Sequence, residues 1–131
     1  MRRNYAEDAV QRSIIQWLRI KGFLCTSQGA GLIKSAVTQR IANGLGYLKG
    51  SSDIIVFIPN GCLHIEVKRP EKMKYSFKTN RMIVANSSGK QSESQKDFQE
   101  KISKIPGHHY LVVTDVQQVI DFIKAMKINP L

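Results

Sequence analysis

The sequence feature that most constrains the fold is a run of five apolar residues, Ile54–Ile58. A continuous apolar stretch of this length, ended by turn residues, is typical of a buried β-strand. The turn residues Pro59-Asn60-Gly61 follow at once, and the segment Leu63–Lys68 then alternates strictly between apolar and polar residues. Such alternation predicts a second strand, which Pro70 ends. Together the two segments predict an antiparallel hairpin.

Helices and further strands are predicted on both sides of this hairpin. The three-and-four spacing of apolar residues indicates an amphipathic helix from Tyr5 to Lys21, with Asn4 as its N-cap and Gly22 as its end. The other predicted elements are a strand at Phe23–Thr26, helices at Ser35–Asn43, Ser92–Lys104 and Asp115–Met126, and a strand at Tyr110–Val113. The polar, basic segment Glu71–Lys90 is expected to be an irregular loop or to carry a small hairpin around Arg81 to Val84. This order predicts one α/β (α+β) domain over residues 1–131, with a mixed central sheet flanked by helices.

The balance of charge limits the class of partner. Twenty Lys and Arg against ten Asp and Glu give a formal net charge of +10. This surplus favours binding to a polyanion such as DNA, because phosphate neutralisation releases counterions; a solvated basic surface is the alternative. Two cysteines, Cys25 and Cys62, are too few for a disulfide framework, so a cytoplasmic location is expected. The sequence contains neither a signal-peptide pattern nor an apolar run long enough for a bilayer, so no membrane partner is expected.

Three charged residues are predicted to meet at one end of the hairpin. Residues two apart in a strand share a face, so Glu66 and Lys68 lie side by side, opposite the apolar Ile65 and Val67. Asp53 precedes the first strand, and the start of one hairpin strand lies beside the end of the other. Two carboxylates suit a hard divalent cation, and a neighbouring lysine suits the activation of water or the stabilisation of phosphate charge. The alternative is an exposed Glu–Lys pair beside a turn aspartate.

Four segments of the sequence together form an ordered set of motifs. They are Gly50-Ser51-Ser52-Asp53-Ile54-Ile55, Ile65-Glu66-Val67-Lys68-Arg69-Pro70, Ser92-Glu93-Ser94-Gln95-Lys96-Asp97-Phe98 and Gly107-His108-His109-Tyr110-Leu111-Val112-Val113. In this order they resemble the VRR-NUC branch of the PD-(D/E)xK nuclease superfamily, with Gly-x-x-Asp before a strand, then Glu-x-Lys, then Ser-x-x-Gln opening a helix. The resemblance covers nearly the whole chain and implies a restriction-endonuclease-like core.

The resemblance also implies the roles of particular residues. The implied catalytic residues are Glu7, Asp53, Glu66, Lys68 and Gln95. Asp53, Glu66 and the carbonyl of Val67 would be ligands of Mg²⁺, or of Mn²⁺, and Lys68 would be the catalytic lysine. Glu7 has an alternative role as the return half of a capping box, and Gln95 as an ordinary first-turn helix residue. The implied activity is that of a DNA endonuclease acting as a homodimer on branched DNA such as four-way junctions, in a bacterial or phage-infected cell.

Two features depart from the family pattern. Ser52 replaces the proline that is common before the aspartate, which alters backbone stiffness rather than chemistry. The segment Glu71–Lys90 is longer and more basic than the usual link.

The remaining polar residues support weaker interpretations. His64 is expected to be a surface strand residue, and His64, His108 and His109 with the two cysteines lack zinc-ligand spacing, so no structural zinc site is predicted. Basic residues that flank the hairpin are interpreted as phosphate contacts, with solvated loops as the alternative; they are Lys34, Arg40, Lys49, Lys72, Lys74, Lys78, Arg81 and Lys90. Ser51 and Arg69 are also interpreted as nucleic-acid contacts.

Two other functional classes stay open. One is a nucleic-acid-binding module that keeps the fold without cleaving. The other is a nuclease with another substrate, namely linear duplex, flap or RNA. No recognition-helix or zinc-finger signature is present in the sequence, so strong sequence specificity is not expected.

Overall fold

A four-stranded mixed sheet forms the centre of the protein. The computed structural model describes residues 5–28, 40, 41, 44, 45, 48, 50–70, 72–86 and 89–131. The strands are β1 (Leu24–Ser27), β2 (Ile54–Ile58), β3 (Gly61–Val67) and β6 (His108–Val113). They lie in the order β1-β2-β3-β6, with the first two pairs antiparallel and the pair β3–β6 parallel. The mixed central sheet predicted from the sequence is confirmed.

The predicted hairpin is formed by β2 and β3. Ile58 pairs with Gly61, so Pro59 and Asn60 alone make the turn. Asn60 has φ 65°, in the left-handed region that asparagine tolerates better than most residues. The second strand begins at Gly61, two residues earlier than the alternation in the sequence indicated.

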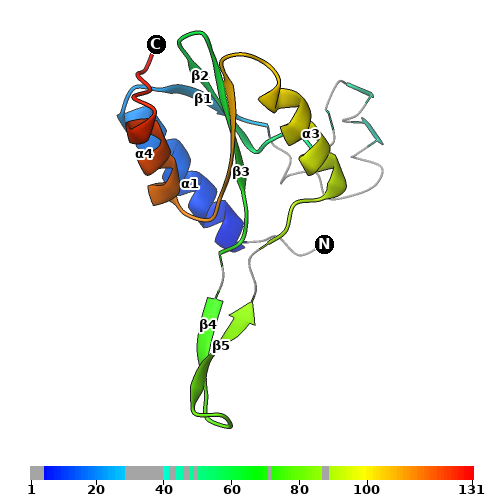
Figure 1. Cartoon of the computed structure of the whole chain (residues 1–131), viewed down its shortest axis with the longest axis vertical. Coiled ribbons are helices and arrows are strands. Elements are labelled where there is room, and N and C mark those ends of the chain that lie inside the picture. Colours follow the sequence, from blue (N-terminus) through cyan, green and yellow to red (C-terminus); the bar gives the residue numbers. More distant parts are fainter. Residues whose placement is uncertain are drawn as a thin grey trace.

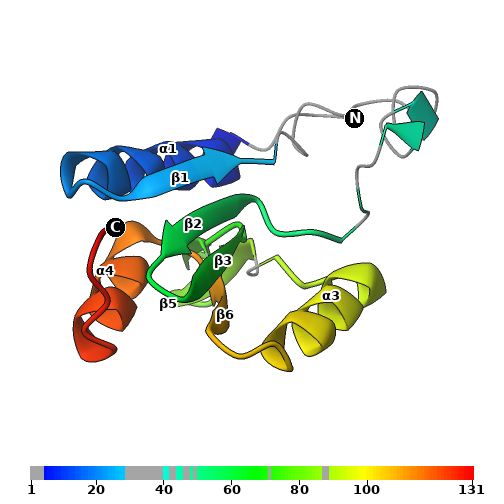
Figure 2. The same cartoon turned by 90° about the horizontal axis from the view of Figure 1, so that it is seen from above.

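Helices cover both faces of this sheet (Figures 1 and 2). The helices α1 (Tyr5–Ile20) and α4 (Val116–Ala125) lie on one face, and α3 (Glu93–Ser103) lies on the other. The core between the sheet and the helices α1 and α4 consists of buried residues, namely Ile14, Leu18, Ile54, Val56, Leu63, Ile65, Val67, Val119 and Ile123. The apolar stripe of α1 and the apolar face of β3 therefore meet as their periodicities predicted.

The segment after β3 departs from the prediction of an irregular loop. Lys72–Ser76 (β4) and Arg81–Asn86 (β5) form a two-stranded antiparallel hairpin that projects from the body of the protein (Figure 1). This hairpin is larger than the small one considered around Arg81 to Val84. Lysines alternate with apolar residues in 72–75, and their charge obscured a period of two that is typical of a strand.

Some predictions fall on residues that the structure does not describe. Most of the helix predicted at Ser35–Asn43 lies outside the described residues, although residues 40 and 41 are helical. Asn4, the predicted N-cap of α1, also lies outside them. Within the described ranges, no helix combines the length and the apolar character needed to cross a bilayer.

Candidate active site

One face of β3, the face toward α3, carries the charged residues of the predicted centre. Glu66 and Lys68 point to this side, and their relative exposures are 2% and 9%. The alternative of an exposed Glu–Lys strand pair is therefore wrong. Burial of two charged groups is costly unless they are paired or serve a ligand. The Lys68 Nζ lies 3.4 Å from the Glu66 Oε1, so the two form an ion pair.

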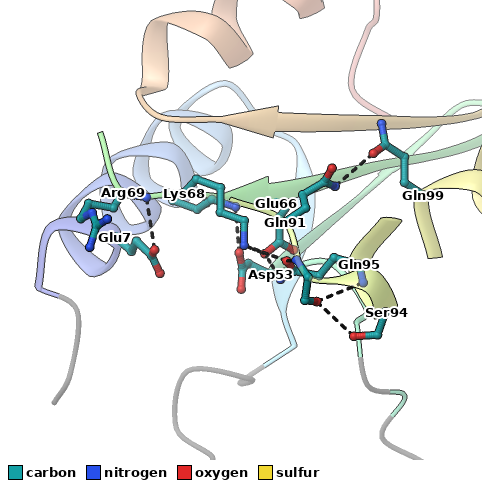
Figure 3. Close-up of polar contacts among 11 residues, drawn as sticks. Glu7, Asp53, Glu66, Lys68, Arg69, Gln91, Ser94, Gln95 and Gln99 are labelled. Carbon is teal, nitrogen blue, oxygen red and sulfur yellow. Dashed lines mark hydrogen bonds and ion pairs between the residues drawn. The ribbon is translucent and has the colours of Figure 1, made fainter. Parts of the chain in front are cut away.

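Asp53 reaches this face from the turn before β2. Its Oδ2 accepts a hydrogen bond of 2.8 Å from the Val67 backbone N–H, which holds the carboxylate against β3 (Figure 3). The loop leading to Asp53 packs closely on α3, because a Cβ on Gly50 would collide with the Ser94 carbonyl. Gly50 also has φ 89°, so a glycine is needed there on both grounds.

The first turn of α3 contributes Gln95, which connects Lys68 and Glu66. Its Oε1 accepts a hydrogen bond of 2.8 Å from Lys68 Nζ, and its Nε2 donates one of 2.6 Å to Glu66 Oε1. The same Oε1 accepts the Ser92 N–H at 2.8 Å, while the Ser92 Oγ accepts the Gln95 N–H at 3.2 Å. This capping box fixes the helix start and also orients the amide. Gln95 is therefore more than an ordinary first-turn residue.

Glu7 reaches the same region from the first turn of α1. Its Oε1 accepts a hydrogen bond of 3.2 Å from the Arg69 backbone N–H, directly after Lys68 (Figure 3). Burial raises the pKa of Glu7, against the opposing effect of that hydrogen bond. The capping role considered for Glu7 involves Asn4, which lies outside the described residues.

The carboxyl groups of Asp53 and Glu66 share a desolvated environment. Burial, together with the neighbouring Asp53 carboxylate, raises the pKa of Glu66 to about 8, against the charge of Lys68. Burial also raises the pKa of Asp53, although the Val67 N–H opposes this rise. Without a cation, Glu66 therefore keeps its proton near neutral pH.

The donor set fits a hard divalent cation. The Glu66 Oε2 is buried and has no hydrogen-bond partner among the described residues. A buried anionic oxygen needs a proton or a cation nearby. Oxygen ligands from two carboxylates are the donors that Mg²⁺ and Mn²⁺ prefer. Asp53 and Glu66 thus satisfy the chemistry of the predicted metal site.

The predicted nucleic-acid contacts have mixed positions. Lys34 and Lys49 lie outside the described residues, and for Lys72 only the backbone is described. The side chains that reach solvent on described segments are Arg40, Lys74, Lys78, Arg81 and Lys90. Ser51 and Arg69 are half-buried beside the carboxylate centre, where Ser51 Oγ is buried without a partner among the described residues.

Sequence reasoning missed one glycine at the site. Gly89 donates its N–H to the Arg69 carbonyl at 3.1 Å. A Cβ there would be 3.5 Å from Lys68 Cδ and 3.6 Å from Glu7 Oε1. The chain that leaves β5 thus returns over the centre, an approach that no local pattern in the sequence indicates.

The prediction that His64 is a surface residue was wrong. His64 is 4% exposed rather than a surface residue, and its ring contacts His108 and Phe98. Cys62, His64 and His108 have potential ligand atoms that all lie within 4.8 Å of one another. Sequence spacing could not show this, because His108 lies 44 residues from His64 in the sequence and reaches it only through the parallel pairing of β3 and β6.

Comparisons with known proteins agree with the fold. No protein-family model and no curated protein matches the sequence. The structure is similar to a solved structure described as a VRR_NUC domain protein, with a TM-score of 0.63 and 20% sequence identity. The match covers 95% of this chain and 91% of that chain. The chain therefore has the fold of a VRR_NUC domain protein, the fold that its sequence motifs predicted.

Proposed function

We propose that the protein is a metal-dependent DNA endonuclease that hydrolyses phosphodiester bonds. The observation that carries this proposal is the Asp53–Glu66 carboxyl pair: the buried Glu66 Oε2 has no hydrogen-bond partner among the described residues, while the Oε1 of the same carboxylate pairs with Lys68. Asp53 and Glu66 would hold Mg²⁺ or Mn²⁺, with the Val67 carbonyl as a further ligand from the motif resemblance. Such an ion, when bound, acidifies water and screens the charge on the scissile phosphate.

The chain's own groups supply orientation and charge at the reacting phosphate. Lys68 is held by Gln95 and Glu66 through contacts of 2.8 and 3.4 Å. An ammonium has three donors, so one stays available for a water or a phosphate oxygen. Held in place before the reaction, this charge stabilises the transition state without reorganisation. Glu7, from α1, would act on the centre directly or through a water.

The β4–β5 hairpin supports DNA as the substrate. Lys74, Lys78 and Arg81 are exposed on it. Its two ends lead to Arg69 and Gly89, whose backbones are hydrogen-bonded beside Lys68. A basic arm that starts at the catalytic centre contacts phosphates near the bond to be cut.

A homodimer that cuts branched DNA is the finer form of this proposal. One chain carries one carboxylate centre in its described part, and paired incisions in opposed strands need two equivalent centres. Tyr75 and Met82 are cross-strand partners on the hairpin face opposite Lys74 and Arg81, and they are 46% and 59% exposed. We infer that this apolar face packs against a second copy, while the basic face contacts DNA.

The catalytic proposal is tested with purified protein and labelled linear duplex, flap, four-way junction and RNA substrates, with and without Mg²⁺. Asp53→Asn is expected to abolish cleavage and to leave DNA binding largely intact. Lys68→Ala is expected to lower the cleavage rate on the order of 10²–10³-fold, whereas Lys96→Ala, at an exposed lysine of α3, is the matched control. If the unaltered protein binds DNA without cleaving it, the protein is a nucleic-acid-binding module and the nuclease proposal is wrong. If the protein prefers linear duplex, the proposal that it acts on branched DNA is wrong.

The dimer is tested by light scattering after gel filtration. Met82→Lys is expected to shift the protein toward the monomer, because it places a charge in the apolar contact. Met126→Lys alters a methionine of similar exposure, 50%, at the end of α4 and should leave the dimer unchanged. A monomeric unaltered protein at micromolar concentration would contradict the dimer.

A further inference from the structure

A second cluster of ligand-type side chains lies on the same face of β3 as the carboxylates, toward the other end of the strand. Cys62 and His64 are two residues apart and therefore share that face. His108 begins β6 and is the register partner of Cys62. The sheet thus brings together one thiol and two imidazoles from segments more than 40 residues apart.

The geometry of the cluster is compact. The His64 Nε2 and the His108 Nδ1 are 3.0 Å apart, and the two rings are nearly parallel with centroids 5.3 Å apart. All three potential ligand atoms lie within 4.8 Å of one another. In a tetrahedral zinc site, with Zn–N near 2.0 Å and Zn–S near 2.3 Å, ligand atoms are separated by roughly 3.3 to 3.6 Å. The nitrogens already have nearly this spacing, and the Cys62 sulfur lies within 4.8 Å of both.

We propose that Cys62, His64 and His108 form a zinc site that is separate from the catalytic carboxylates. Sulfur and nitrogen donors select Zn²⁺, whereas Mg²⁺ prefers the oxygen donors of Asp53 and Glu66. The described residues supply three ligands, and water completes the tetrahedron.

The surroundings of His64 suit a ligand that is held in place. Its ring is 4% exposed and packs edge-on against Phe98 of α3, with centroids 5.7 Å apart. Its Nδ1 lies 3.5 Å from the Ser52 Oγ, so the other ring nitrogen has a polar neighbour that can orient it.

The position suggests what the ion does. The starts of β3 and β6 meet closely there, since a Cβ on Gly61 would collide with the Gly107 carbonyl. An ion bound by Cys62, His64 and His108 joins these strand starts across the parallel pair. Through His64 and Ser52 it also braces the loop that carries Asp53. The ion would thus stabilise this part of the sheet, and it needs no part in the cleavage reaction.

The test uses the full chain, stripped of metal with a chelator and then titrated with Zn²⁺ or Co²⁺. One zinc ion per chain should remain after dialysis, and Zn²⁺ should raise Tm by several degrees. Cobalt should give tetrahedral visible bands and a thiolate charge-transfer absorption. Cys62→Ser should remove the thiolate absorption, and Cys25→Ser, at the other free cysteine, should retain it.

Further variants separate this zinc site from the catalytic carboxylates. His108→Gln should abolish the tetrahedral spectrum, whereas His109→Gln, on the opposite face of β6, should retain it. The Asp53→Asn and Glu66→Gln variants should also retain it, even if neither cleaves DNA, so the zinc site and the nuclease proposal can fail separately. A spectrum without thiolate character, or one lost in Asp53→Asn and kept in Cys62→Ser, would overturn the proposal.

Discussion

Gln95 shows how one side chain serves both the fold and the site. Its carbonyl oxygen completes the capping box of α3 with Ser92 and accepts from Lys68. Its amide nitrogen donates to Glu66. The secondary structure therefore sets the direction of the amide, and the amide sets the distance between the carboxylate and the ammonium.

Replacing Gln95 separates these two roles. Gln95→Ala removes the contacts to Glu66 and Lys68 as well as the cap, and it is expected to lower the cleavage rate about tenfold or more. Ser92→Ala weakens the same helix start, at a cost of about 1 kcal/mol, but leaves the Gln95 contacts to Glu66 and Lys68 possible. Single-turnover cleavage and thermal unfolding of both variants are the measurements. Equal loss of cleavage in both would mean that Gln95 acts only as a cap.

At the scale of elements, the β4–β5 hairpin places Lys74 and Arg81 on one face, together with Ile83, and Tyr75 and Met82 on the other. Cross-strand partners point to the same side of a strand pair, so Ser76 and Arg81 share the face of Lys74. Tyr75 and Met82 occupy the other face. With only two strands and no core of its own, the hairpin depends on the body of the protein and on its ligands for its order.

Charge reversal on the hairpin tests its part in DNA binding. The triple variant Lys74→Glu, Lys78→Glu and Arg81→Glu should weaken binding and reduce the steepness of its salt dependence. The slope of log K against log salt changes by about 0.9 for each DNA phosphate that the protein no longer neutralises. Binding is measured by fluorescence anisotropy over a range of salt concentrations.

The matched control for that variant reverses Lys21, Lys124 and Lys127, exposed lysines at or just after the ends of α1 and α4. Those helix ends lie far from the hairpin (Figure 1). Both triple variants change three basic residues to acidic ones and so lower the net charge equally. An equal effect on the salt slope would show that the overall charge, and not the hairpin, governs DNA binding.

At the scale of the whole molecule, the buried carboxyls link folding stability to pH. The pKa of Glu66 is about 8 in the folded protein, above its ordinary value of 4.5, so the folded state binds the extra proton between these values. Stability from this group is therefore complete at low pH and is lost as pH rises toward 8. His64 has the opposite sign, since its pKa falls from 6.5 to about 4, and its contribution grows from pH 4 to 6.5. Of these two groups, only Glu66 affects stability between pH 6.5 and 8.

The metal-free protein should thus lose stability from pH 6.5 to 8, by up to about 1.4 kcal/mol per pH unit. Denaturant unfolding in the presence of a chelator measures this slope. Glu66→Gln should remove the Glu66 contribution, and Glu93→Gln, at an exposed glutamate of α3, should not. Added Mg²⁺ should reverse the loss near pH 8, since a cation compensates the charge that Glu66 gains when it loses its proton. An unchanged slope in Glu66→Gln would contradict the raised pKa.

The sequence by itself determined the central hairpin, the helices α1, α3 and α4, and much of the carboxylate centre. The apolar run of β2, the turn at Pro59 and the alternation of β3 are local patterns, and local patterns place Asp53, Glu66 and Lys68 at one end of a hairpin. The Ser92–Gln95 capping box is equally local. These features depend on residues within a few positions of one another, so the sequence expresses them directly.

Only the tertiary structure decided what lies opposite those residues. It buried both faces of β3, because α3 covers the side that alternation alone marked as polar. In the folded chain Gly89 lies close to Lys68, and the parallel pairing of β3 and β6 places His108 beside His64. Such contacts join segments that are distant in sequence, and their free energy comes from packing the whole sheet between its helices. No periodicity or residue spacing in the sequence indicates these long-range contacts.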